Sequence, residues 1–150
     1  MIKQKSFTIF VFFLSLFFFS VSVADDIFLS LKKNKVNVRY GPSFNFPIKY
    51  VYRKINLPIK QIDTKENWRR IIDFKNNSGW IHWSQLKKVN SIILLEDQIL
   101  FKRPSTFSTP IALIKMGRLL ALKKCDTKWC KIETANYKGW VKKNKIWGLN

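Results

Sequence analysis

The sequence is poor in the residue types from which most active sites are built. Its 150 residues include one His, two Cys and nine Asp plus Glu. A Cys–His peptidase needs a thiolate beside an imidazole base that a third polar group holds. The single His, His82, lies in the first half of the chain, and both Cys, Cys125 and Cys130, lie in the second. The few carboxylates form no pair suited to acid and base roles across a cleft. The sequence therefore predicts a protein without catalytic activity.

Metal and phosphate sites are also unsupported by the sequence. A zinc site needs a second Cys pair or a neighbouring His beside Cys125 and Cys130, and neither is there. Only five Gly occur, and they form no glycine-rich phosphate loop, so we expect no metal and no cofactor. A hairpin loop over the four intervening residues would place the two Cys opposite one another, which predicts a disulfide in an oxidising compartment.

The N-terminus has the features of an export signal. Lys3 and Lys5 precede an apolar run over residues 7–23, and a small-residue cleavage site ends at Ala24. We interpret residues 1–24 as a signal peptide and expect the mature protein to be periplasmic or secreted. An uncleaved inner-membrane anchor is the alternative, because the apolar run is close to the lower limit of about 17 residues that span a bilayer.

Acidic residues are so few that the chain is strongly basic. After residue 24, 26 Lys and Arg stand against nine acidic residues, which gives a formal charge of +17. The excess is divided evenly between residues 25–90 and 91–150, so there is no separate basic tail. Strong positive charge is typical of nucleic-acid binding, but export makes nucleic acid an unexpected partner. We expect weak electrostatic contact with anionic envelope surfaces instead.

The chain repeats itself with a period near 60 residues. The offsets are 62, 61 and 60 residues at three landmarks, which are Pro42 and Pro104, Trp68 and Trp129, and Gly79 and Gly139. A period of this length is too long for a solenoid repeat and is about the smallest that closes its own core. The sequence therefore predicts two small domains, residues 25–90 and residues 91–150.

Each copy consists of short strand-like runs separated by turn signals. In the first copy the runs are residues 27–31, 36–39, 47–52, 57–62, 68–74 and 79–83, and none has a convincing helical period. The second copy follows the same plan. About five short strands with tight turns predict a small antiparallel barrel in each copy, so the expected fold class is all-β. The connection over residues 87–90 is short, which favours two barrels held side by side.

The Gly-Trp pairs have a structural interpretation. Gly79 and Gly139 lack a side chain, so another backbone can approach them closely at a barrel corner. Trp80 and Trp140 are then expected to cover the end of the core, with stacking on a ligand as the alternative.

Two motifs of the first copy resemble the bacterial SH3-like (SH3b) domain. Residues 37–43 read N-V-R-Y-G-P-S, and residues 79–82 read G-W-I-H. The second copy closes with K-G-W-V at residues 138–141 but carries F-K-R-P at residues 101–104, where the family has V-R-x-G-P. The resemblance covers essentially the whole chain after the signal peptide. It implies tandem five-stranded barrels that bind cell-wall peptide or an envelope protein.

The candidate ligand site is expected in the first copy. Gly41 is expected to give the loop after its second strand a positive-φ conformation, which Arg103 at the matching position cannot adopt easily. The loop and the neighbouring strands supply aromatic and basic side chains for a shallow groove. These candidates are Arg39, Tyr40, Phe44, Phe46, Trp68, Arg70, Trp80, His82 and Trp83.

Two other functions fit the same residues. Both barrels could pack against a partner chain, which would make the protein a structural or assembly component of the envelope. An accessory role beside a cell-wall hydrolase is a further alternative, because SH3b-like barrels are often attached to such enzymes.

Overall fold

The computed structural model describes residues 27–149 and contains strands with one short 3₁₀ helix. The predicted signal peptide, residues 1–24, lies outside the described residues. Within the described part, no helix has the length and apolar character needed to cross a bilayer. The all-β fold class is confirmed.

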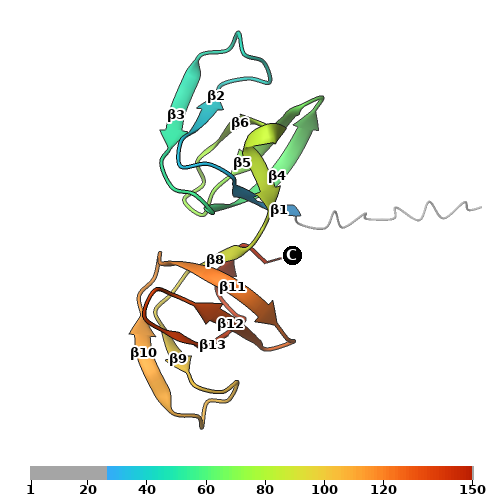
Figure 1. Cartoon of the computed structure of the whole chain (residues 1–150). Coiled ribbons are helices and arrows are strands. Elements are labelled where there is room, and N and C mark those ends of the chain that lie inside the picture. The colour runs from blue at the N-terminus through green and yellow to red at the C-terminus, as the bar shows by residue number, and fades with distance from the viewer. Residues whose placement is uncertain (1–26, 150) are drawn as a thin grey trace, which may run out of the picture.

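The first unit is a single antiparallel sheet that bends around its own core (Figure 1). Its strands pair in the order β3-β2-β6-β5-β4-β1-β7. The 3₁₀ helix Trp83–Gln85 lies between β6 and β7. The strands are β1 (Ile27–Leu31), β2 (Val36–Arg39), β3 (Ile48–Tyr52), β4 (Pro58–Lys65), β5 (Trp68–Ile72), β6 (Ser78–His82) and β7 (Leu86–Lys88).

The second unit repeats this topology strand for strand. Its order, β10-β9-β13-β12-β11-β8-β14, matches the first order position by position. The strands are β8 (Ser91–Leu94), β9 (Gln98–Phe101), β10 (Pro110–Ile114), β11 (Leu119–Cys125), β12 (Trp129–Glu133), β13 (Lys138–Lys142) and β14 (Ile146–Trp147). Each sheet has seven strands where about five were expected, partly because β7 and β14 are too short to show an alternating pattern.

Each unit buries its own set of aliphatic side chains. Alternation along β2 turns Val36 and Val38 inward, where they meet Ile71 and Ile81 of the facing strands. The second core is built in the same way around Leu100, Ile132 and Val141. Further members of the first core are Leu31, Leu57 and Ile59, and of the second Ile92, Leu94, Ile114, Leu120 and Cys130.

Two glycines allow strands to cross closely, as their lack of a side chain indicates. A Cβ atom at Gly139 would lie 2.6 Å from the Phe101 carbonyl oxygen, and one at Gly79 would overlap the Val38 side chain. Gly41 has a different role from the predicted one. Among the described residues only Gly117 and Gly148 are glycines with positive φ. The Phe46 ring instead occupies the space where a Cβ of Gly41 would stand, at 2.6 Å.

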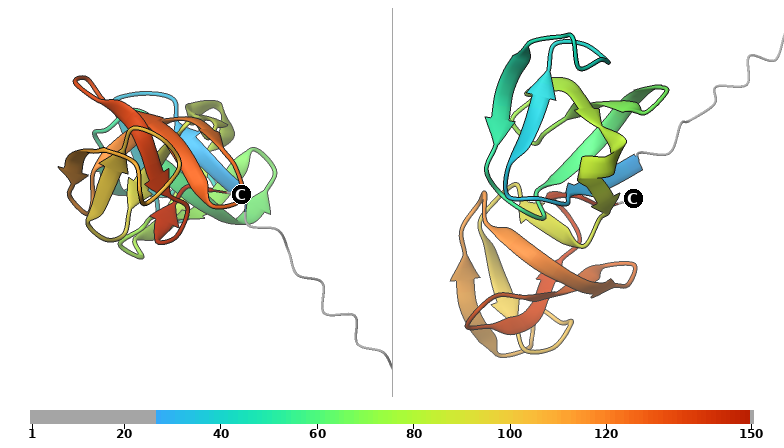
Figure 2. Two further views of the ribbon diagram at one scale, coloured as in Figure 1. Left: turned by 90° about the horizontal axis from the view of Figure 1, so that it is seen from below. Right: turned by 45° about the horizontal axis from the view of Figure 1, so that its top comes forward.

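The two units are stacked end to end and share an interface (Figures 1 and 2). Ile93 of β8 is buried in the core of the first unit, and Trp147 packs against that core. The Trp147 indole Nε1 donates a hydrogen bond to the Pro58 carbonyl oxygen at 2.9 Å. Trp147 also makes an edge contact with Phe28, with ring centroids 5.0 Å apart. Residues of the second unit therefore complete the core of the first.

Candidate functional site

Strand pairing places the predicted polar and aromatic residues of the first unit on the outer face of the sheet. Trp80 is paired with Arg39 on one side and with Arg70 on the other. Trp68 is paired with His82 on the same two strands as Arg70 and Trp80. Directly paired residues point to the same side of an antiparallel sheet, so all five share one face. This face lies opposite the core.

Four rings on this face form an aromatic cluster, which consists of Phe44, Trp68, His82 and Trp83. The Phe44 ring lies 5.0 Å from Trp68 and 5.4 Å from His82, centroid to centroid. His82 lies 5.3 Å from Trp68 and 6.5 Å from Trp83. Trp68 is only 6% exposed beneath these rings, whereas Phe44 is 64% exposed and Trp83 54% exposed. The cluster therefore has a fixed base and an accessible apolar top.

Arg39 holds the loop that carries Phe44. Its guanidinium Nη1 donates to the carbonyl oxygens of Phe44 at 3.2 Å and Phe46 at 2.6 Å. The same guanidinium lies 5.5 Å from the centre of the Phe44 ring. These contacts use the positive charge to fix the aromatic cluster, so Arg39 acts mainly as a positioning residue.

The remaining candidates lie beside the cluster. Tyr40 is exposed, and its ring faces the Lys49 ammonium at 5.6 Å. Phe46 packs over Gly41 on the same loop. Arg70 and Trp80 share the outer face but lie further along the strands, and within residues 27–149 no ring contact joins Trp80 to the cluster. Trp80 and Trp140 were expected to cover the end of the core, but they lie on the outer sheet face, opposite Ile81 and Val141, and belong to neither core.

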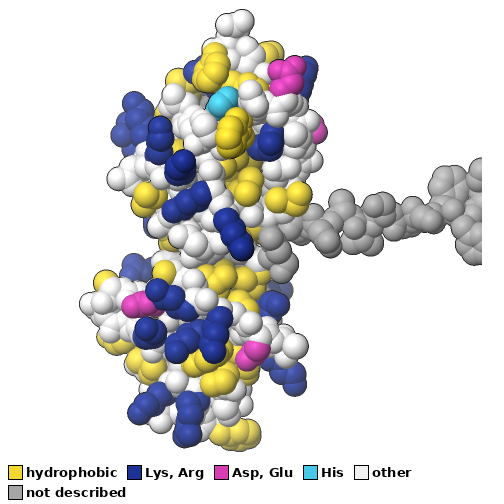
Figure 3. Space-filling view, turned by 45° about the vertical axis from the view of Figure 1, so that its right-hand side comes forward, with side chains coloured by type: hydrophobic (Ala, Val, Ile, Leu, Met, Phe, Trp, Pro, Cys, Tyr) yellow, Lys and Arg dark blue, Asp and Glu magenta, His cyan; other side chains and the backbone are white. Residues whose placement is uncertain are grey.

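His82 serves local structure. Its Nδ1 lies 2.8 Å from the Ser84 hydroxyl and accepts a weak hydrogen bond from the Ser84 amide, so the ring caps the 3₁₀ helix. Figure 3 shows the histidine of the first unit bordered by hydrophobic side chains. In the described part of the chain, no three His, Cys, Asp or Glu side chains gather where they could hold a metal ion.

Asp73 is a buried polar residue that sequence patterns did not single out. Its carboxylate accepts hydrogen bonds from the Tyr52 hydroxyl at 2.9 Å and from the amides of Lys75 and Asn77, both at 2.9 Å. Burial, followed by the contact with Tyr50, raises the pKa of Tyr52. This network ties the β5–β6 turn to β3, and we assign it a structural role. The sequence D-F-K-N-N at residues 73–77, an Asp at the start of an Asn-rich turn, is the signal that could have indicated it.

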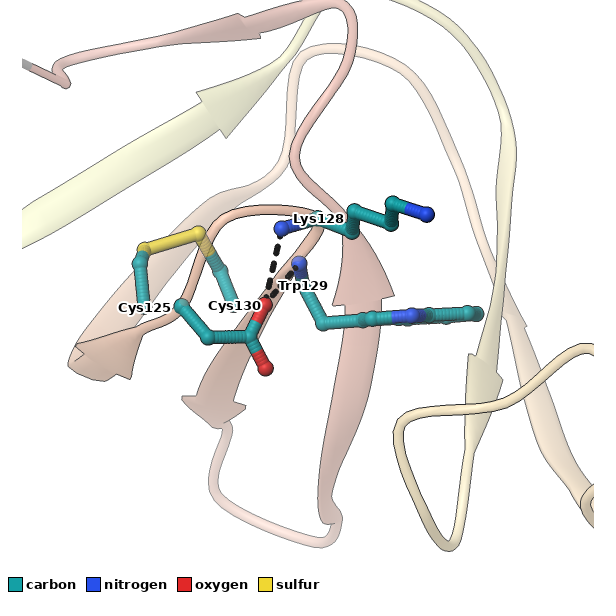
Figure 4. Close-up of a disulfide and its surroundings, with 5 residues drawn as sticks. Cys125, Lys128, Trp129 and Cys130 are labelled. Atoms are coloured by element: carbon teal, nitrogen blue, oxygen red, sulfur yellow. Dashed lines mark hydrogen bonds between the residues drawn. A yellow bond between two sulfur atoms is a disulfide. The ribbon is translucent and has the colours of Figure 1, made fainter.

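The second unit contains the predicted disulfide between Cys125 and Cys130 (Figure 4). These residues are paired on β11 and β12, as Thr64 and Arg69 are in the first unit. Inside the closed turn, the Asp126 carboxylate accepts hydrogen bonds from the amides of Lys128 and Trp129, at 2.8 and 2.7 Å. These bonds lower the pKa of Asp126.

A groove opens beside this turn, in the copy where no ligand site had been expected. The cavity has a volume of about 700 Å³. Its walls come from the β9–β10 loop, the β11–β12 turn and the end of β13. The residues that line it include Thr106, Phe107, Lys128, Trp129, Lys142 and Lys143.

Comparison with known proteins assigns the chain to a family. The sequence profile described as bacterial SH3 domain matches residues 32–88 and residues 96–148. No curated protein matches the sequence. Among solved structures, the chain is similar to NlpC2 and NlpC1 from Trichomonas vaginalis and to an NlpC/P60 family protein from Bacillus cereus.

Sequence identity to these three structures is 12%, 12% and 13%, and the TM-scores are 0.37, 0.38 and 0.37. The matches cover 81%, 85% and 80% of this chain. They cover 47%, 47% and 55% of the other chains, so this chain spans about half of their length. Because the family profile matches both halves and most of the chain, the protein belongs to the bacterial SH3 domain family.

Proposed function

We propose that the protein is an exported, non-catalytic binding module of the bacterial cell envelope. It contacts cell-wall peptide or an envelope protein through the aromatic cluster of its first unit. The observation that carries the proposal is that a bacterial SH3 domain match coincides with a preformed, accessible group of rings on the outer sheet face. A binding role fits this family. The periplasm or the cell exterior is the proposed location.

The geometry of the cluster supports binding. Trp68 and His82 are fixed on paired strands, and Arg39 fixes the loop that carries Phe44. Rigid aromatic side chains supply a large contact area at a low cost in conformational entropy. A ligand with an apolar group would therefore bury the exposed surfaces of Phe44 and Trp83 without reorganising the site.

A sedimentation assay with purified sacculi tests this proposal. The double variant Phe44→Ala/Trp83→Ala should reduce the bound fraction at least tenfold, because aromatic anchors at interfaces typically contribute about 2 kcal/mol or more. Tyr137→Ala removes an exposed aromatic ring from the second unit and is the control.

Salt separates the aromatic contact from nonspecific attraction. At about 1 M salt the screening length falls to about 3 Å, so attraction that depends on the net positive charge is lost. Retention of the wild-type protein at this salt concentration would support the aromatic cluster as the contact. Failure to sediment at both low and high salt would contradict a cell-wall peptide as the partner.

A role in protein assembly is the second candidate, favoured by apolar side chains on β9 and β10. Ile99 and Leu113 are paired across these strands, and both are exposed, as is Ile111. β10 is also an edge strand of its sheet, which offers unpaired backbone groups to a partner strand. Site-specific crosslinking in the native cell would distinguish the two candidates, because assembly would attach an envelope protein at Ile99 or Leu113 and leave the aromatic cluster of the first unit uncrosslinked.

A further inference from the structure

The same surface position is closed in the first unit and open in the second. The backbone frame is shared, since the Trp83 amide donates to the Asn67 carbonyl at 2.8 Å and the Lys143 amide donates to the Lys128 carbonyl at 2.8 Å. Each loop also contains the same backbone hydrogen bond. In the β2–β3 loop the amide of residue 46 donates to the carbonyl oxygen of residue 43, and in the β9–β10 loop the amide of residue 108 donates to the carbonyl oxygen of residue 105. The two sites therefore differ mainly in their side chains.

Loss of the covering rings opens the groove, because Thr106, Lys142 and Lys143 stand where the first unit has Phe44, His82 and Trp83. Phe44 covers Trp68 in the first unit, and the matching position in the second unit is Thr106, whose side chain is too short to cover Trp129. The next residue, Phe107, is 99% exposed and lies at the rim. Trp129 is consequently accessible from the groove, while the edge of the Phe101 ring supports it at 5.7 Å.

The disulfide gives this open site a support that the first unit does not need. Trp68 is held by the rings above it, whereas Trp129 lacks such a cover. The disulfide from Cys125 to Cys130 and the Asp126 carboxylate instead hold the turn that carries Trp129 (Figure 4). A turn braced in this way keeps a binding groove preorganised without filling it.

Three lysines give the groove a positive rim. Lys128, Lys142 and Lys143 line it, and the ion pairs recorded for residues 27–149 involve none of them. The nearby Asp126 carboxylate accepts hydrogen bonds from two backbone amides and interacts with the Lys143 ammonium only through longer-range electrostatics. The Glu96 carboxylate accepts from the Asn144 side chain at 3.3 Å. Ammonium groups that form no salt bridge, around an apolar floor, are complementary to carboxylates that flank an apolar group.

We propose that this groove of the second unit is a binding site for an acidic peptide segment. An apolar side chain of the peptide packs on Trp129, and carboxylates on either side of it bind the ammonium groups of Lys128, Lys142 and Lys143. The site is separate from the aromatic cluster of the first unit and does not depend on it. The protein therefore carries two recognition surfaces of different chemistry on one repeated frame.

Peptide titration of the full chain tests the proposal, with the indole N–H signals of its six Trp as site-resolved reporters. The probe is the capped tripeptide Glu-Phe-Glu, and the matched neutral probe is Gln-Phe-Gln. The Trp129 signal should shift with Glu-Phe-Glu, and the neutral probe should bind about tenfold more weakly, because it loses the contacts with the lysine rim. Lys142→Gln/Lys143→Gln should remove most of this preference.

The substitution Thr106→Phe transfers one covering ring of the first unit, that of Phe44, to the second. It should weaken binding of Glu-Phe-Glu at least tenfold while the other five indole signals stay in place, which reports an intact fold. Tyr137→Ala, an exposed ring outside the groove, should bind like the wild type.

Equal affinity for Glu-Phe-Glu and Gln-Phe-Gln would overturn the proposal, and so would shifts confined to the indoles of Trp68 and Trp83. Unchanged binding by Lys142→Gln/Lys143→Gln would also contradict it, whether or not Thr106→Phe folds. None of these outcomes bears on sedimentation with sacculi, which reports the first unit through Phe44 and Trp83.

Discussion

The interface between the units leads to a prediction about one buried side chain. Ile93 lies in the second unit by sequence and by strand pairing, yet it is 1% exposed and belongs to the core of the first unit. The substitution Ile93→Ala removes three carbon atoms from this core. At about 0.8 kcal/mol for each buried methylene, the transfer term is about 2.4 kcal/mol. The cavity left behind raises the expected loss of stability to about 3–4 kcal/mol.

Urea denaturation followed by hydrogen exchange measures this effect. A loss of this size should lower the urea midpoint by about 1–2 M. Protection of backbone amides from exchange should also fall in β2 and β6. These strands belong to the first unit, whereas Ile93 lies on β8 of the second unit. Ile99→Ala is the matched control, because Ile99 is exposed on β9 and its truncation should change the unfolding free energy by less than about 0.5 kcal/mol.

The reasoning would be refuted by either of two results. In the first, Ile93→Ala would lower the unfolding free energy no more than Ile99→Ala does, which would mean that the contact with the first core is not formed in solution. Alternatively, exchange could accelerate only in the second unit, which would mean that the two units unfold independently.

Three further predictions concern single features of the second unit. Replacing Cys125 and Cys130 by Ser should lower the unfolding free energy by about 2 kcal/mol, measured against wild type with and without reductant, because the closed loop is short. Gly139→Ala should lower Tm through a loss of about 1–3 kcal/mol, because its Cβ would meet the Phe101 carbonyl. Hydrogen bonds from Lys115 and the Met116 amide lower the pKa of Asp97 in the folded protein. The ionised Asp97 carboxylate therefore stabilises the fold above its usual pKa of about 4, and this stabilisation is lost as the pH falls through the lower folded value. Asp97→Asn should therefore flatten the decline of Tm in acid, and an unchanged decline would contradict this assignment.

The duplicated landmarks were enough to predict the fold class and the repeated topology. Trp68 and Trp129 begin equivalent strands, and Gly79 and Gly139 stand where strands cross closely, because each role depends on the residue type and its neighbours in sequence. The pairing of Cys125 with Cys130 was likewise evident from a four-residue spacing. Alternation cannot reveal the partner of a buried strand, so the packing of Ile93 and Trp147 against the first unit needed the structure.

The candidate site was only partly accessible to sequence reasoning. The structure brings Arg39, Phe44, Trp68, His82 and Trp83 together, because loop and strand residues converge on one face. The groove of the second unit was missed because the motif there is degenerate, and a degenerate motif was interpreted as a weaker site.

An alignment of the two copies contains the signal that would have revealed this groove. An offset of 62 residues places Thr106 against Phe44, and this loss of a ring above a Trp exposes the Trp. The same alignment of the loops shows Arg103 against Gly41, a difference that the backbone tolerates because Gly41 is not among the positive-φ glycines.

The most direct test of recognition without catalysis is a titration of the full chain with soluble, purified cell-wall fragments, observed through the six indole signals. The account predicts that the signals of Trp68 and Trp83 shift in a saturable manner and that the fragments are recovered intact. Unshifted indole signals at the highest fragment concentration would contradict recognition of the cell wall, and fragments recovered cleaved would contradict the absence of catalysis.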